Sequence, residues 1–201
     1  MITMKVRFLL TVLMIIVGRS ATQAQIKLIP FQENEKWGFN DEKGTVMIKP
    51  QFIVANNFLP TGIAAVVDSI GWAYINTEGN VVIRPFIYDN GPDYFSEGLA
   101  RFTRDDKFGF FDDTGQIIIE PQFDFAFPFS GGLSAICMGC KKRKEDEHTV
   151  IEGGKWGYVG KRGEVVIDVK FEKAKSYEHG KARVMIDGRW MTIDKKGNTV
   201  R

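Results

Sequence analysis

Short runs of alternating apolar and polar residues, separated by turns that contain Gly and Asp or Asn, fill the chain from about residue 26 onward. One kind of run sets an aromatic residue, a small residue and a second aromatic in succession, as in Trp37-Gly38-Phe39. Another kind is β-branched, as in Val81-Val82-Ile83. Short runs of both kinds, bounded by turn residues, are typical of β-strands. The pattern therefore predicts an all-β protein.

The aromatic run recurs at a nearly constant interval. Its first aromatic occurs five times, at Trp37, Trp72, Phe108, Trp156 and Trp190. The spacings between them are 35, 36, 48 and 34 residues. Internal periods of this size mark repeat architectures, in which one small unit is stacked on the next. The long third spacing indicates an insert at about residues 137–155.

A turn and a second strand follow each aromatic run. The turn carries an Asx residue three positions before a Gly, which is type I turn chemistry, at Asp41, Asn76, Asp112 and Asp194, whereas the fourth copy has Gly160. The β-branched strand then leads to a proline in three copies, at Pro50, Pro85 and Pro121. Because proline lacks the N–H that a ladder needs, we expect each proline to end its strand.

A third strand precedes the aromatic run of each copy and follows a variable loop and a Gly. Its small and apolar residues alternate with positions that admit Arg101, Lys181 or Arg183, so we expect one buried and one partly wet face. The copies then form five antiparallel three-stranded units at about 26–49, 62–84, 98–120, 132–168 and 181–201. Stacked units shelter apolar faces that a single unit cannot bury.

The predicted fold class is an all-β repeat array of these units, either a curved open array or a propeller-like ring. The last copy, Trp190-Met191-Thr192, has lost the small residue and the second aromatic. Terminal repeats of stacked arrays are atypical because they face solvent on one side. This favours the open array.

The repeated segments resemble the WG-repeat family of bacterial proteins. The resemblance rests on "KWGFNDEKGTVMIKPQF", "GWAYINTEGNVVIRP" with "FSEGLA", and "KWGYVGKRGEVVIDVKFEKAKSYEHGKA", and it covers essentially all of 26–201. The departures are Ala73 for Gly, Phe108 for Trp, Gly160 for Asx, Val169 for Pro, and the fifth copy. The resemblance implies an all-β array, often exported, that acts as a binding or interaction module. It brings no catalytic residues.

The first 24 residues differ from the repeats. Lys5 and Arg7 precede an apolar run at 8–17, and a small-residue polar stretch leads to Ala24. This is the layout of a secretory signal peptide, with cleavage expected after Ala24. The apolar run is shorter than the roughly 20 residues that span a bilayer. We therefore predict a periplasmic or secreted protein, with residues 25–201 as one domain and no transmembrane segment in the mature chain.

The charge of the mature chain argues against a nucleic-acid partner. The formal charge of +2 includes three positive charges before residue 25, which leaves −1 for the mature chain. Binding to phosphates requires a surplus of Lys and Arg. A protein or glycan partner in the envelope fits the composition better.

The insert concentrates unusual chemistry, because it holds Cys137, Cys140 and His148. A disulfide between the two cysteines is one hypothesis, since exported Cys pairs usually oxidise. A thiol-redox site is the second, with a helical turn at 141–147 behind Cys140. A metal site that uses both cysteines and His148, completed by Glu145 or Glu147, is the third, although structural zinc prefers four strong ligands.

The aromatic residues allow two interpretations. The strand aromatics recur as a glycan-binding array would, but their alternating positions favour core packing. Loops carry function more often than strands. Our candidate ligand contacts are therefore the loop residues Tyr88, Asp93, Tyr94, Phe95, Phe125, Phe127 and Phe129, some of which must fold inward.

No catalytic constellation is evident in the sequence. His148 and His179 are the only histidines and belong to different repeats. Ser96 and Ser130 belong to the recurring Phe-Ser-x-Gly element, where we expect each hydroxyl to cap a turn. We expect no cofactor and a non-enzymatic binding or interaction module of the bacterial cell envelope. The alternatives are a periplasmic thiol-redox protein that uses Cys137 and Cys140, and a glycan- or cell-wall-binding module.

Overall fold

The computed structural model describes residues 27–145 and 148–200. The predicted signal peptide lies outside the described residues. Within them the regular structure consists of β-strands, and no helix could cross a membrane. The all-β prediction is confirmed.

The strands form five antiparallel sheets in chain order and one small hairpin within the described chain. The sheets contain β1 (Ile29–Glu33), β2 (Lys36–Asn40) and β3 (Val46–Phe52); β4 (Val54–Ala55), β5 (Ala64–Val67), β6 (Trp72–Ile75) and β7 (Val81–Ile83); β10 (Leu99–Arg104), β11 (Lys107–Asp112) and β12 (Ile117–Phe123); β13 (Phe125–Ala126), β14 (Leu133–Glu145), β15 (His148–Gly160) and β16 (Val165–Phe171); and β17 (Lys173–Ala174), β18 (Lys181–Ile186), β19 (Arg189–Asp194) and β20 (Thr199–Val200). The hairpin consists of β8 (Ile87–Tyr88) and β9 (Gly91–Pro92).

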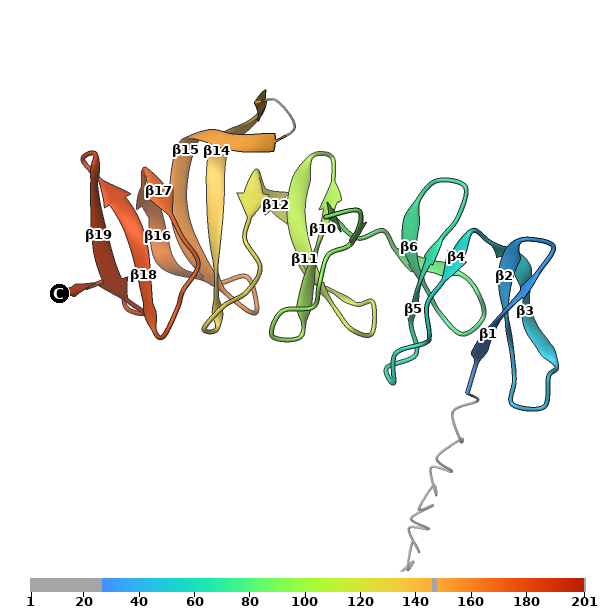
Figure 1. Ribbon diagram of the computed structural model, residues 1–201. Coiled ribbons are helices and arrows are strands. Elements are labelled where there is room, and N and C mark those ends of the chain that lie inside the picture. Colours follow the sequence, from blue (N-terminus) through green and yellow to red (C-terminus); the bar gives the residue numbers. More distant parts are fainter. Residues whose placement is uncertain (1–26, 146–147, 201) are drawn as a thin grey trace, which may run out of the picture.

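The sheets stand side by side in an open row (Figure 1). The first sheet lies at one end of the row and the last sheet at the other. Each sheet contains the three strands that the repeat predicts. Three of the sheets add a two-residue outer strand that the sequence did not indicate, namely β4, β13 and β17.

The glycine of the Trp-Gly pair lies under a bulge of the next strand. Trp37 pairs with Phe52 and Phe39 with Ile48, so Gly38 faces the extra residues of β3. A Cβ on Gly38 would lie 2.5 Å from the Ile48 carbonyl oxygen, and Gly109 has the same clearance from Ile119. A real Cβ does not approach a backbone oxygen so closely. This confirms that the small residue permits a close approach of two backbones.

The prediction that proline ends its strand is wrong for Pro50 and Pro121. β3 continues to Phe52 and β12 to Phe123. The prolines lie in the bulges, where the ladder is interrupted and no partner needs their missing N–H. Pro85 does lie beyond β7.

The turns have the predicted hydrogen bonds. The Asp41 carboxylate accepts the N–H groups of Lys43 at 2.9 Å and Thr45 at 2.8 Å, and Gly44 has a φ of 83°. In the fourth copy, the Glu164 carboxylate accepts the Arg162 N–H at 3.1 Å instead. The Glu164 carboxylate occupies the space that a Cβ of residue 160 would need, which explains the glycine at that position.

Apolar clusters fill the junctions between successive sheets. The cluster of the first junction contains Phe39 and Val66, and that of the last junction contains Tyr158 and Val184. The prediction of a wet face holds at the last sheet, where Lys181 and Arg183 are exposed. It is wrong at Arg101, which is 4% exposed, because the third sheet lies between two neighbours that cover both of its faces.

Candidate binding site in the loops

Each loop that leads into a sheet places one aromatic ring against the preceding sheet. The ring centroids are 4.8, 5.7, 4.8 and 4.9 Å apart for Phe39–Phe58, Tyr74–Phe95, Phe110–Phe129 and Tyr158–Tyr177. All four contacts are edge-to-face arrangements, which aromatic pairs prefer. Phe129, a predicted ligand contact, is 1% exposed and therefore belongs to the core.

Phe125 and Phe127 also face inward. Their rings lie 5.9 and 5.6 Å from the ring of Trp156, and both pack against the cluster between the fourth and fifth sheets. Both side chains are half-buried. They contribute mainly to packing, so the prediction that they contact a ligand has no support from their surroundings.

Asp93 is buried beside Arg101. The Arg101 side chain donates from Nε at 2.8 Å and from Nη2 at 2.7 Å to the two carboxylate oxygens, and its backbone N–H donates at 3.0 Å. The remaining guanidinium nitrogen Nη1 donates to the Ala126 carbonyl at 2.9 Å. These bonds explain why a charged pair is buried here, and they leave Asp93 little capacity for a ligand.

Tyr88 and Tyr94 are the predicted loop residues that remain open to solvent, at 55% and 71% exposure. Tyr88 lies in the β8–β9 hairpin, and Tyr94 follows it. The hairpin is held by the Trp72 indole, whose N–H donates to the Asn90 carbonyl at 3.1 Å. The two exposed tyrosines thus lie in or next to the β8–β9 hairpin, which is additional to the repeated sheets.

A hollow of about 300 Å³ lies between this segment and the loop before β5. Its lining is Asn56, Asn57, Leu59, Ala65, Tyr74, Gly91, Pro92, Asp93, Tyr94 and Phe95. Three of the seven predicted loop contacts therefore meet at one place. The side chains of Asn56 and Asn57 make no hydrogen bond to any residue that the structure describes, so their amides are open to a ligand. No signal in the sequence distinguishes this Asn pair from ordinary turn residues.

The Tyr74 hydroxyl of this hollow is protonated at neutral pH. Burial is the larger cause, and the nearby Asp93 carboxylate the smaller, of the rise in the pKa of Tyr74 to about 12. A phenol in this state both donates and accepts a hydrogen bond at neutral pH.

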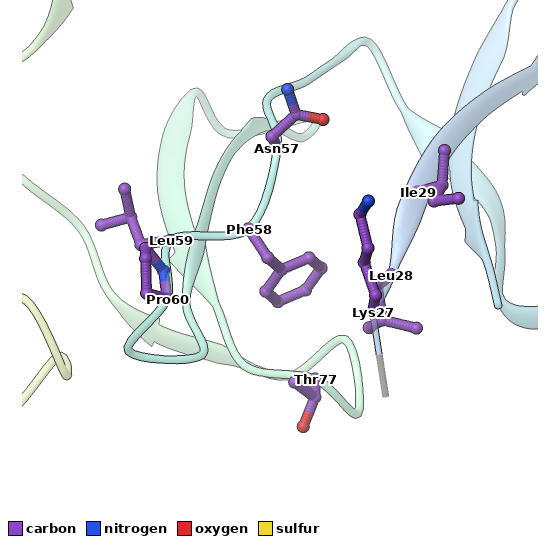
Figure 2. Close-up of a pocket in the computed structure, with 8 residues that line it drawn as sticks. All are labelled: Lys27, Leu28, Ile29, Asn57, Phe58, Leu59, Pro60 and Thr77. Atoms are coloured by element: carbon purple, nitrogen blue, oxygen red, sulfur yellow. The ribbon is translucent and has the colours of Figure 1, made fainter. Parts of the chain in front are cut away.

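A second hollow, of about 540 Å³, lies on the other side of the same loop. Figure 2 shows the Phe58 ring between the Leu59–Pro60 segment and residues 27–29. Thr77 completes the lining on the β6–β7 turn. Asn57 and Leu59 line both hollows, so the segment Asn57–Leu59 is a ridge between them.

The prediction that the serines of the Phe-Ser-x-Gly element cap their own turns is wrong. The Ser96 hydroxyl donates to the Phe129 carbonyl at 2.6 Å, and that of Ser130 donates to the Tyr177 carbonyl at 2.5 Å. Each bond joins the loop of one sheet to the loop of the next. Neither serine has a histidine beside it in these contacts.

The insert is a long hairpin formed by the ends of β14 and β15. Cys137 and Cys140 are joined by a disulfide, with their Cα atoms 6.0 Å apart. β14 continues through Cys140 to Glu145, so the predicted helical turn is wrong over 141–145, and residues 146–147 lie outside the described chain. Lys142 places its Nζ 4.9 Å from the centre of the Phe108 ring, so the hairpin covers part of the third sheet, toward which it turns in Figure 1.

The disulfide also bears on the metal hypothesis. Disulfide sulfurs are not thiolates, and zinc is bound by thiolates. In the part of the chain that the structure describes, no group of three or more His, Cys, Asp or Glu side chains is arranged to hold a metal ion. The side chains of Glu147 and His148 are outside that part.

Comparisons with solved structures found low similarity. The crystal structure of a eukaryotic initiation factor is 13% identical, with a TM-score of 0.40, and the match covers 87% of this chain and 52% of that one. Kluyveromyces lactis Hsv2 is 13% identical, with a TM-score of 0.35 and coverages of 88% and 60%. A protein of unknown function from Bacteroides caccae is 16% identical, with a TM-score of 0.25 and coverages of 87% and 76%. This chain spans between half and two thirds of the first two.

Comparisons of sequence identify the repeat. No curated protein matches the chain. The family model described as "WG containing repeat" matches four segments, 37–67, 72–108, 108–141 and 156–190. Together these segments cover more than half of the chain, and each begins at the first aromatic of one copy. The chain therefore belongs to the WG containing repeat family.

Proposed function

We propose that this protein is an exported, non-enzymatic binding module of a bacterial cell envelope, and that it binds a glycan in the two hollows beside the Asn57–Leu59 ridge. The observation that carries the proposal is the meeting of open amides and an exposed aromatic ring at one ridge. Asn56 and Asn57 offer donors and acceptors, and Tyr94 offers a ring face. Ligand sites commonly combine apolar walls with a few placed polar groups, and their volumes reach several hundred Å³.

The rigidity of the surrounding sheets supports this role. The ridge is anchored by Phe58, whose ring packs on Phe39 in the first sheet, and by the Leu59 N–H, which donates to the Ile63 carbonyl at 2.7 Å. A site held in this way loses little conformational entropy when a ligand binds. The loops thus present recognition groups on a fixed scaffold.

Retention on insoluble cell-wall polysaccharide tests the proposal. We expect the wild-type chain to be retained and both Asn57→Ala and Tyr94→Ala to reduce retention. Tyr88→Ala is the matched control, because Tyr88 is an exposed tyrosine that lines neither hollow. Equal retention of all four proteins, or no retention of the wild type, would contradict glycan binding at the ridge.

Export needs a separate test, since it rests on residues 1–24. We expect the chain expressed in a bacterium to be found outside the cytoplasm, with Gln25 as its first residue. A cytoplasmic product that keeps Met1 would contradict the proposed localisation while leaving the glycan site open.

A protein partner is the second candidate, and one surface feature favours it. The strands that follow the turns begin with exposed apolar pairs in three sheets: Val46 and Met47, Val81 and Val82, and Val165 and Val166. These strands are the edges of their sheets. Replacing Val81 and Val82 with Thr would weaken a protein complex at this surface and leave polysaccharide retention unchanged.

A further inference from the structure

The last sheet of the row carries an exposed charged residue at a paired position that two earlier sheets fill with alanine and tyrosine, and that the third sheet fills with the buried Arg101 opposite Phe110. In the second and fourth sheets, Ala65 pairs with Tyr74 and Ala135 pairs with Tyr158. The corresponding pair in the last sheet is Arg183 and Thr192. At the earlier junctions the tyrosine ring receives an aromatic from the next loop. Thr192 has no ring to offer.

A hollow of about 360 Å³ occupies this face. Its lining is Lys175, Ser176, Glu178, Lys181, Ala182, Arg183 and Thr192. The lining thus contains three cationic side chains and one carboxylate, an excess of positive formal charge. Hydroxyl groups of Ser176 and Thr192 add further hydrogen-bonding capacity.

Trp190 fixes two of these cations. The guanidinium carbon of Arg183 lies 5.1 Å from the ring centre, and the Nζ of Lys175 lies 5.7 Å from it. Within residues 27–145 and 148–200 neither side chain forms an ion pair. A guanidinium that stacks on a ring keeps its N–H groups free in its own plane, where they match the two oxygens of a carboxylate. The cations are thus held in place without being neutralised.

The geometry points to a binding site for an acidic polypeptide segment on this face, with its carboxylates on Arg183 and Lys175. The charge of the hollow selects an acidic ligand. The strand register selects a polypeptide, because the same register receives a loop of the chain at each earlier junction. At the preceding junction, the Tyr158 hydroxyl donates to the Lys175 carbonyl of the incoming loop at 2.9 Å. The site lies in the last sheet and is independent of the ridge at Asn57.

Fluorescence anisotropy with a labelled hexaglutamate peptide tests this site. We expect the purified chain to bind the peptide at low salt and to release it as ionic strength rises. The double variant Arg183→Ala/Lys175→Ala should weaken binding by about tenfold, since two charge-assisted hydrogen-bonding groups are lost. Its thermal unfolding midpoint should not change, because both side chains are exposed.

The matched control removes the same charge from the opposite end of the row. Lys43→Ala/Lys49→Ala should leave the affinity unchanged, because these exposed lysines belong to the first sheet. An equal loss of affinity in both double variants would show that net charge alone attracts the peptide, and it would overturn the proposal of a site at Arg183 and Lys175. No peptide binding by the wild type would overturn it as well.

Two further measurements test the class of ligand and the role of the Trp190 ring. Polygalacturonate that binds as tightly as the peptide, with the same dependence on Arg183, would overturn the choice of a polypeptide. Trp190→Phe should retain most of the affinity, and Trp190→Ala should lose as much as the double variant. An unchanged affinity in Trp190→Ala would contradict the positioning role of the indole.

Discussion

The rings of Phe110 and Phe129 lie 4.8 Å apart, centroid to centroid, although they belong to successive repeats. Phe110 lies in β11, and Phe129 lies in the loop that leads to the fourth sheet. Both are essentially inaccessible to solvent. The stability of each repeat therefore depends on rings that its neighbour provides, as expected for a stacked array.

Removal of one such ring should destabilise the whole row. We expect Phe129→Ala to lower the free energy of unfolding by about 3–5 kcal/mol, the usual cost of an emptied aromatic site in a core. Urea denaturation followed by tryptophan fluorescence measures this change. Tyr94→Ala is the control and should cost less than about 0.5 kcal/mol, because Tyr94 is a surface residue. Similar values for the two variants would contradict the conclusion that Phe129 belongs to a core between the third and fourth sheets.

The small residue of the Trp-Gly pair can be tested in the same assay. In Gly109→Ala the new Cβ would lie 2.5 Å from the Ile119 carbonyl oxygen and 2.8 Å from a ring atom of Phe102. The strands must separate to relieve this overlap, so we expect a loss of about 1–3 kcal/mol or more. Gly91→Ala is the matched control, since its Cβ would meet nothing within 4 Å. A tolerated Gly109→Ala would refute the close-approach explanation.

Most of the fold could be predicted because the signals are local. The Asp41 turn and the Trp37 strand follow from alternation and turn chemistry within one copy, and the repetition predicts stacking. The passage of β3 through Pro50 could not be predicted, because it depends on a bulge opposite Gly38 rather than on the proline itself. The burial of Arg101 was also hidden, since Asp93 reaches it through a hairpin peculiar to the third repeat.

The candidate site was predicted only in part. An exposed Tyr94 and a buried Phe129 look alike in a loop sequence, and only the neighbouring sheet decides which ring is covered. Asn56 and Asn57 gave no signal, because asparagine is common in turns for reasons unrelated to ligands. Loop packing, rather than loop composition, determines which side chains remain available.

Acid should weaken the protein through Asp68. Its carboxylate accepts hydrogen bonds from Arg84, at 2.6 and 3.2 Å, and these lower its pKa from 3.8 to about 2. Because the pKa is lower in the folded state, the stabilisation is complete above pH 4 and is lost as pH falls toward 2. Solvent screening limits it to about 1 kcal/mol.

Asp68→Asn should remove this pH dependence. We expect it to lower the unfolding free energy at pH 7 by about 1 kcal/mol and to flatten the decline between pH 4 and 2 by the same amount. Urea titrations at several pH values measure both effects. Glu120→Gln, at the exposed pair with Arg104, is the control and should change little. A decline in Asp68→Asn as steep as in the wild type would assign the acid sensitivity to other groups.

The buried pair of Arg101 and Asp93 should be far more sensitive to substitution. Asp93→Asn leaves the guanidinium at 4% exposure without its countercharge, so we expect a loss of about 3–5 kcal/mol. Differential scanning calorimetry would show this as a clear fall in the unfolding temperature. The Glu120→Gln variant is again the reference, because both members of the pair formed by Arg104 and Glu120 face water. A small change in Asp93→Asn would mean that Arg101 finds water or another acceptor in the variant.

The disulfide distinguishes a structural role from a redox role. The two cysteines are three positions apart in the sequence, so the disulfide closes a very short loop. We therefore expect Cys137→Ala/Cys140→Ala to lower the free energy of unfolding by no more than about 2 kcal/mol and to leave the row of sheets folded. Cys137 is inaccessible to solvent, and neither cysteine lies at a helix end, where reactive thiols are usually activated. We therefore expect the wild-type chain to give no thiol-dependent reduction of insulin above the rate of dithiothreitol alone. Reduction that is fast in the wild type and absent in the folded double variant would replace the binding proposal with thiol–disulfide exchange.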